Sequence, residues 1–89
     1  MFVPIGIMPA AAHITRVSST AELGAELRAA RRARGLRLED VALGAGVGTR
    51  FVSELERGKP TVRLAETLRV AASLGLRLIV EDPDGRPDA

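Results

Sequence analysis

Apolar residues recur in steps of three and four along four stretches of the chain, which is the spacing of amphipathic helices. In the first stretch these residues are Leu23, Leu27 and Ala30, and Gly35 closes it, as glycine often does just beyond a helix. The helices predicted in this way span 21–34, 38–44, 49–57 and 63–74. In the last of them, the pattern places on one face Leu64, Leu68, Ala71 and Leu74.

Local signals indicate how these helices begin and how they are joined. Ser19 and Glu22 have the S-x-x-E spacing of a capping box, which satisfies free amides at a helix start. Gly46 lies between the second and third helices, where a tight turn usually needs a positive φ. Gly48 precedes the third helix and has no side-chain oxygen, so we expect it to be a weaker cap than serine or threonine.

The two ends of the chain differ from this helical middle. Residues 1–18 include two prolines and a glycine near the start, so we expect an irregular arm that is mobile, paired as a short strand or packed on a partner. Residues 76–80 are apolar and partly β-branched, which is typical of a strand. Residues 81–89 form an acidic segment that we expect to be flexible. The globular unit predicted by the sequence is therefore 19–80.

The predicted strand at 76–80 raises the question of its partner. A single strand in a helical domain leaves its backbone amides and carbonyls without hydrogen bonds. Three partners are open: residues 2–8 of the same chain, the same segment of a second copy, or another protein.

The amino-acid composition argues against disulfide bonds, metal binding and catalysis. The chain has no cysteine and one histidine, His13, so a disulfide framework, a thiolate metal site and a catalytic constellation have almost nothing to build from. We therefore expect no enzyme activity, no metal and no cofactor. No apolar run approaches the roughly 18 residues of a membrane span, and we expect the protein to be cytoplasmic.

Charge is distributed unevenly along the chain. Residues 1–80 carry 12 Arg and Lys against 7 Asp and Glu, whereas residues 81–89 carry 4 acidic residues against one arginine. A basic body suits a polyanionic partner such as nucleic acid, although a solvated arginine-rich surface would give the same count.

The second and third predicted helices, joined by a glycine turn inside a small bundle, have the form of a helix-turn-helix. Ala42 is small, as a close crossing of these two helices requires, and Val47, Val52 and Leu55 would hold the third helix to the core. Five residues of the third helix are left to face outward, namely Thr49, Arg50, Ser53, Glu54 and Arg57.

These residues resemble a known family. The run from Gly35 to Val47, followed by Phe51-Val52-Ser53-Glu54-Leu55-Glu56-Arg57-Gly58, is similar to the XRE family of phage-repressor-like regulators. The run from Lys59 to Leu76 is similar to its HipB-type antitoxin branch. The resemblance covers about residues 20–80. It implies an all-α, lambda-repressor-like bundle of four to five helices with a short C-terminal β-strand.

The resemblance also implies roles for individual residues. The third helix would enter the major groove of double-stranded DNA, with its exposed residues reading base edges. The expected base contacts are Thr49, Arg50, Ser53 and Glu54. The expected phosphate contacts are Arg37, Arg57, Lys59 and Arg63. Arg31 and Glu56 match a buried ion pair of related repressors, the alternative being two unrelated solvated side chains.

Two positions depart from the family pattern. Where family members usually have a Thr-Gln type pair opening the second helix, this chain has Arg37 and Leu38. Leu38 cannot donate the glutamine's hydrogen bond to phosphate, while Arg37 offers a replacement contact. Together with Gly48 at the cap of the third helix, this suggests looser sequence-specific binding than is usual in the family.

The HipB-type resemblance further implies a homodimer. Two copies would pair their closing strands, through Leu76, Leu78 and Val80, and present two recognition helices to a palindromic operator. The implied protein partner is a HipA-like serine/threonine kinase toxin.

The sequence leaves three hypotheses for the function of the protein. The first is a repressor that is also the antitoxin of a two-gene toxin–antitoxin module and represses its own operon. The second is a stand-alone transcriptional regulator, and the third is a protein-interaction module without specific DNA binding.

Overall fold

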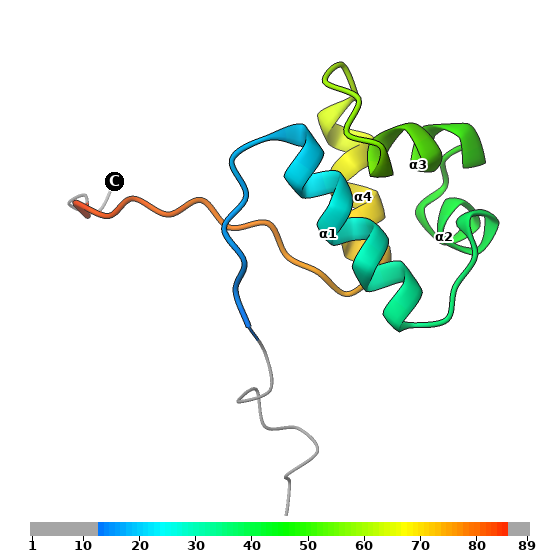
Figure 1. Ribbon diagram of the computed structural model, residues 1–89, viewed down its shortest axis with the longest axis horizontal. Coiled ribbons are helices and arrows are strands. Elements are labelled where there is room, and N and C mark those ends of the chain that lie inside the picture. The colour runs from blue at the N-terminus through cyan, green and yellow to red at the C-terminus, as the bar shows by residue number, and fades with distance from the viewer. Residues whose placement is uncertain (1–12, 86–89) are drawn as a thin grey trace, which may run out of the picture.

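Four helices form in the computed structural model, which describes residues 13–85 (Figure 1). They are α1 (Thr20–Ala33), α2 (Leu38–Ala45), α3 (Thr49–Glu56) and α4 (Leu64–Ser73). The predicted helix-turn-helix bundle is therefore confirmed, and each predicted helix differs from the observed one by one residue at one or both of its ends. None of the helices in the described part of the chain is long and apolar enough to cross a membrane.

The core is built from small and medium aliphatic side chains contributed by all four helices. α2 packs against both α3 and α4, and α1 packs against α3. Since aromatic residues make up only 2% of the chain, short apolar side chains fill the interior and let the helices approach closely. The buried apolar residues are Leu27, Val41, Ala42, Ala45, Val52, Leu55, Val70, Ala71 and Leu74.

The buried face of α4 differs from the face that the sequence pattern predicted. Leu64 and Leu68 are 68% and 45% exposed, while Thr67 and Val70 point into the core beside Ala71 and Leu74. The prediction is wrong for Leu64 and Leu68, because the buried face of α4 also takes in Thr67 and Val70 and is therefore turned away from these two leucines. Thr67 is only 2% exposed, and its hydroxyl donates a hydrogen bond of 2.7 Å to the Arg63 carbonyl, which removes the cost of burying it.

The start of α1 follows the predicted capping pattern only in part. The Ser19 hydroxyl accepts a 3.0 Å hydrogen bond from the Glu22 amide, as a cap should. The Glu22 carboxylate, however, accepts from the amide and the hydroxyl of Ser18, at 2.6 and 3.0 Å, rather than from the Ser19 amide. Glu22 therefore fastens the residue before the cap onto the first turn of α1.

The turns behave as their glycines predicted. Gly35, just beyond α1, and Gly46, just beyond α2, have φ values of 69° and 71°. These left-handed conformations are costly for residues with a Cβ, so glycine sets the short connections that place α3 across α2.

No strand ladder forms among residues 13–85, so the predicted strand at 76–80 is not part of the single-chain structure. The segment leaves the end of α4 and runs away from the helices, at the side of the molecule opposite α2 and α3 (Figure 1). Leu76 still packs against the core, whereas Ile79 and Val80 are 67% and 91% exposed. The expectation that this segment pairs with residues 2–8 lies outside the described residues, as do most of the expected arm and the last residues of the tail.

Candidate nucleic-acid interface

The position of α3 is set first by a close approach of α1. Gly24 lies within α1, and a Cβ built on it would collide with the Leu55 carbonyl oxygen and lie 2.7 Å from the Glu56 carbonyl oxygen. Only glycine lets the α1 backbone pass this near to the end of α3. The close crossing predicted from the sequence was that of α2 and α3 at Ala42, and this approach of α1 to α3 at Gly24 was not predicted.

An ion pair strengthens the same junction. Arg31 Nε donates to Glu56 Oε2 at 2.6 Å and Arg31 Nη2 donates to Glu56 Oε1 at 3.0 Å, a bidentate arrangement. The two side chains are only 12% and 7% exposed. Arg31 Nη1 also donates to the Leu36 carbonyl at 2.8 Å. The structure thus brings together the two residues that the resemblance paired, and links α1, the loop before α2 and the end of α3.

The C-terminus of α3 is held by the first turn of α1. The Thr20 hydroxyl donates a 2.9 Å hydrogen bond to the Gly58 carbonyl. Gly58 itself has a φ of 83°, and a Cβ there would lie 2.7 Å from the Ala21 Cα. The chain after α3 therefore turns sharply against α1, and this turn directs Lys59 back toward α3.

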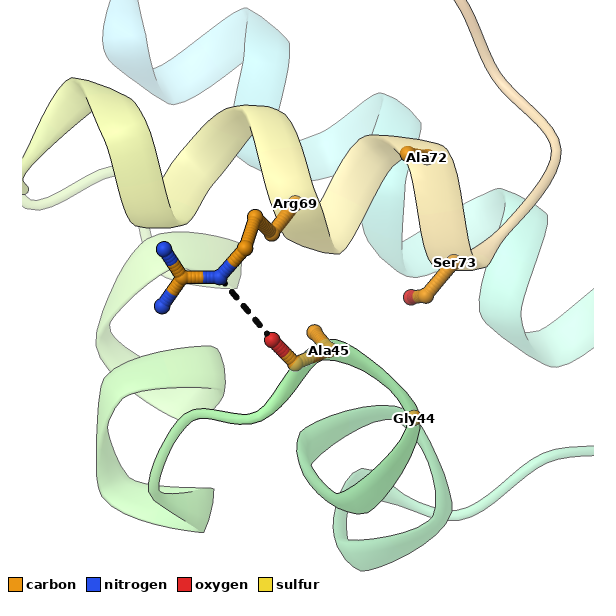
Figure 2. A pocket seen from close by; sticks show the side chains of 5 residues that line it. All are labelled: Gly44, Ala45, Arg69, Ala72 and Ser73. Carbon is orange, nitrogen blue, oxygen red and sulfur yellow. Dashed lines mark hydrogen bonds between the residues drawn. The ribbon is translucent and has the colours of Figure 1, made fainter.

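At each end of α2, a side chain forms a hydrogen bond with a backbone group. At its start, the Asp40 carboxylate accepts a 2.8 Å hydrogen bond from the Arg37 amide. At its end, Arg69 of α4 reaches across, and its Nε donates to the Ala45 carbonyl at 3.1 Å (Figure 2). A cation at a helix C-terminus complements the helix dipole and an otherwise unpaired carbonyl. Sequence reasoning missed Arg69, because nothing local to either residue reveals this tertiary contact.

The outward face of α3 carries the predicted base-contacting residues. Thr49 and Arg50 occupy its first turn and are exposed, and the Arg50 side chain is 91% exposed. Arg50 Nε contacts Glu54 Oε2 at 3.2 Å, and Lys59 Nζ contacts Glu54 Oε1 at the same distance. Ser53 lies beside them and accepts a 2.8 Å hydrogen bond from Arg57 Nη1.

The Glu54 carboxylate is charged at neutral pH in this arrangement. The hydrogen bond from Lys59, followed by that from Arg50, holds the pKa of Glu54 below its usual value. The Glu54 side chain is 19% exposed, so it lies under the two cations and they remain outermost.

The other two predicted phosphate-contacting residues, Arg63 and Arg37, stand immediately before α4 and α2. Arg63 precedes α4, where its guanidinium sits 5.5 Å from the centre of the Phe51 ring and its Nε pairs with Glu66 at 3.0 Å. Glu66 has a lowered pKa, caused first by a hydrogen bond from its own backbone amide and then by Arg63. Arg37 precedes α2 and is exposed, with its Nε 4.0 Å from Asp40.

The departure at Leu38 produces a small apolar spot within a basic surface. Leu38 is half-buried at the first position of α2. A shallow hollow between α1, α2 and α3 is lined by Arg28, Arg31, Leu38, Ser53, Glu56 and Arg57. Arg28 of α1 and Arg57, just after α3, therefore line the hollow beside Leu38, while Arg31 is paired there with Glu56.

Comparison with known proteins places this geometry in a family. Residues 22–78 match the family described as Helix-turn-helix domain. The y4mF protein of Sinorhizobium fredii strain NGR234, described as an uncharacterized HTH-type transcriptional regulator, is 38% identical over 71 residues, covering 80% of this chain and 93% of that protein. The chain therefore belongs to the helix-turn-helix family, and it is an XRE-type regulator.

Two solved structures share the fold. In a HipA–HipB–O2–O3 complex, the similar chain has a TM-score of 0.72 and 19% identity, with 78% of this chain and 97% of that chain covered. The restriction-modification controller protein C.AhdI from Aeromonas hydrophila has a TM-score of 0.60 and 33% identity, with 65% of this chain and 88% of that chain covered. The first likeness concerns the fold alone, because its sequence identity is low.

Proposed function

We propose that this protein is a sequence-specific transcriptional repressor that reads the major groove of double-stranded DNA through the start of α3. The observation that carries the proposal is the exposed first turn of α3, held at its far end by the contacts that Gly24, Thr20 and Arg31 make. A rigidly placed helix with Thr49 and Arg50 at its N-terminal end suits the docking geometry of helix-turn-helix proteins. Arg50 has the guanidinium fork that binds guanine O6 and N7 together.

The surrounding cations suit contacts with the DNA backbone. Arg57 and Lys59 flank the reading face of α3, while Arg63 and Arg37 stand at the starts of α4 and α2. Contacts of this kind fix the register of a protein on the duplex without reading its sequence. Four such cations would also make binding strongly dependent on salt concentration.

We further propose that the repressor is a homodimer joined through residues 76–80. Leu78 and Val80 are 43% and 91% exposed, and the backbone of this segment has no ladder partner in the described part of its own chain. Pairing with the same segment of a second copy would satisfy that backbone and cover these side chains. Leu76 would contribute least to this pairing, since its side chain already packs on its own core and its amide donates to the Ala71 carbonyl at 2.9 Å. The two α3 helices of a dimer would then meet a palindromic operator.

The finer biological role that we propose is that of a HipB-like antitoxin, which represses its own operon and holds a HipA-like kinase in an inactive complex. The fold shared with a chain of the HipA–HipB–O2–O3 complex supports this role. A stand-alone regulator is the second candidate, and the 33% identity to the controller protein C.AhdI favours it.

The DNA-binding part is tested by titrating wild-type protein and Arg50→Ala against the DNA upstream of its own gene and against random DNA, at two salt concentrations. We expect Arg50→Ala to weaken operator binding by about 1–3 kcal/mol and to leave random DNA almost unchanged. Arg32→Ala, on the exposed side of α1, is the matched control and should leave the ratio of the two affinities unaltered. Wild-type binding no tighter to upstream DNA than to random DNA would favour the protein-interaction module instead.

The antitoxin role is tested separately, by co-expressing the protein with the product of the adjacent gene. Growth arrest by that product alone, relieved by this protein through a stable complex, is the expected result. A neighbouring gene without toxicity, next to an operator that the protein still binds, would leave the stand-alone regulator as the function.

A further inference from the structure

We propose that Glu54 is a positioning residue that sets DNA specificity by holding Arg50 and Lys59 through its two carboxylate oxygens. The inference rests on the proposed DNA-binding function. It assigns Glu54 a different part in that function from direct acceptance of a cytosine amino group. The reading groups in contact with bases would then be Thr49 and Arg50, with Glu54 acting through Arg50.

The geometry divides the Glu54 carboxylate between two cations. Oε2 faces Arg50 Nε, one turn earlier on α3, and Oε1 faces Lys59 Nζ, from the turn after α3, each at 3.2 Å. Lys59 reaches this place because its amide also donates to the Glu54 carbonyl at 3.1 Å, which folds the loop back over the helix. With both oxygens engaged and only 19% of the side chain exposed, the carboxylate is poorly placed to reach a base directly.

The contact with Arg50 leaves its reading edge available. Among the described residues, Glu54 is the hydrogen-bond partner of the Arg50 guanidinium, and it engages Nε. No hydrogen bond from Nη1 or Nη2 is formed within the described residues, and the side chain is 91% exposed, so the two terminal nitrogens are available as the pair of donors that guanine O6 and N7 accept. Fixing a long side chain in this form before binding removes part of the entropy cost of ordering it on the DNA.

The charge of Glu54 has a second consequence. Without it, Arg50 and Lys59 would be two free cations able to grip phosphates on any sequence. The carboxylate takes one unit from their combined charge and competes with phosphate for both. When Arg50 contacts guanine through its terminal nitrogens, the hydrogen bond from its Nε to Glu54 is kept. When the Arg50 side chain instead moves to a phosphate, that hydrogen bond is weakened or lost. Glu54 therefore weakens non-specific binding more than specific binding.

The experiment uses a duplex that wild-type protein enriches from a random-sequence pool, and a scrambled duplex of the same composition. For Glu54→Gln we expect tighter binding to the scrambled duplex and a ratio of enriched to scrambled affinity about tenfold lower, the scale of one weakened bidentate contact. The salt slope on the scrambled duplex should steepen by about 0.9 for each phosphate newly neutralised. Glu26→Gln removes the same charge from α1, where no ion pair with Arg50 or Lys59 is formed, and should leave the affinity ratio unchanged.

Two further variants separate positioning from charge and from direct reading. Glu54→Asp keeps the charge but is one methylene too short to reach both cations, so the affinity ratio should fall while scrambled-duplex binding stays near wild type.

In an Arg50→Ala background, Glu54→Gln should no longer change the ratio of enriched to scrambled affinity. A loss of preference at a single cytosine that persists in that background would show that Glu54 reads the base itself, and would overturn the proposal. So would a Glu54→Gln protein that matches the Glu26→Gln control. Failure of the wild-type protein to enrich any duplex would instead refute the proposed function.

Discussion

The two ends of this molecule differ in how their side chains are engaged. At the α3 end, most charged groups already have partners: Glu56 with Arg31, Glu54 with Arg50 and Lys59, and the Ser53 hydroxyl with Arg57. At the other end, which Figure 1 shows on the far side of α1, residues 78–80 expose apolar side chains to solvent. We call the first, with its side chains paired, the closed end, and the second, with its apolar side chains exposed, the open end.

The two proposed roles, DNA binding at the closed end and dimerisation at the open end, would account for this difference. A DNA-reading surface must be rigid before it binds, because every side chain ordered on binding lowers affinity. An assembly surface has the opposite need, since its apolar area gains free energy only when a second surface covers it. The ion pair between Arg16 and Glu81, at 3.8 Å and with both side chains largely exposed, is a weak tie across this second end.

The largest expected effect comes from preventing residues 76–80, at the open end, from pairing with the same segment of a second copy. Leu78→Glu combined with Val80→Glu should convert a dimer into a monomer, because like charges would face each other across the proposed strand pair. Affinity for a two-half-site operator should fall by about 10²-fold or more, as the second contact is no longer tethered to the first. Sedimentation and DNA titration measure these two changes.

The helices serve as the internal control for that experiment. Neither side chain belongs to the core, so the circular dichroism of the monomeric variant should keep its helical signal. A variant that keeps the molecular mass of the wild-type protein would show that residues 78–80 are not the interface.

The next effect tests how firmly the closed end is held. Glu56→Ala removes one partner of the nearly buried Arg31 pair, and breaking such a pair typically costs about 3–5 kcal/mol. Because Arg31 is 12% exposed, water can reach it in the variant, and we expect a loss at the lower end of that range. Chemical denaturation measures it. Glu81→Ala breaks the exposed pair at the other end and should leave the free energy of unfolding unchanged; equal losses in the two variants would erase the contrast between the ends.

Much of the closed end could be predicted from the sequence, because its signals are local. Helical periodicity gave all four helices, and Gly35 and Gly46 marked turns whose positive φ values the structure has. The Arg31–Glu56 pairing came from a family resemblance and not from spacing, since the two residues lie on different helices. The link between Arg50 and Glu54 was visible as an i, i+4 spacing, but the sequence reading did not use it.

The remaining features could not be read from the sequence because they depend on the packing of distant segments. A glycine inside a helix signals a close approach but does not say to what, so the contact of Gly24 with the Leu55 carbonyl stayed hidden. The position of Lys59 over Glu54 depends on the path of the loop at Gly58. The buried face of α4 was misassigned because Thr67 satisfies its own hydroxyl within the helix.

A smaller effect compares two glycines that both lie within helices. Gly24→Ala places a Cβ against two carbonyl oxygens of α3, and overpacking of this kind costs about 1–3 kcal/mol even though alanine favours helix. At Gly44 the nearest atom to a new Cβ is the Ser73 Cβ, at an ordinary 3.8 Å. Gly44→Ala should therefore stabilise the protein, by about 0.5–1 kcal/mol. Thermal unfolding of both variants tests this, and a stabilising Gly24→Ala would mean that α1 and α3 are further apart than described.

The smallest effect concerns Glu22, whose carboxylate holds Ser18, the residue before the α1 cap, to the first turn of α1. Hydrogen bonds from the Ser18 amide and then from its hydroxyl lower the pKa of Glu22 from its usual 4.5. A lowered pKa in the folded state means that the charged carboxylate stabilises the fold above that usual value, and that this contribution is lost as pH falls through the folded pKa. Glu22→Gln should therefore be less stable than wild type at pH 7, with a difference that shrinks toward pH 3.

Ser18→Ala separates the two donors to Glu22. It removes the hydroxyl but keeps the amide, which contributes the larger share of the pKa shift. Its stability difference from wild type should therefore follow the same pH trend as Glu22→Gln with a smaller amplitude, measured by urea unfolding across this pH range. A difference that stays constant with pH in both variants would mean that the carboxylate is not tied to Ser18 in solution. Ser18 would then not be held to the first turn of α1, and the two ends would differ more in how firmly they are held than the structure shows.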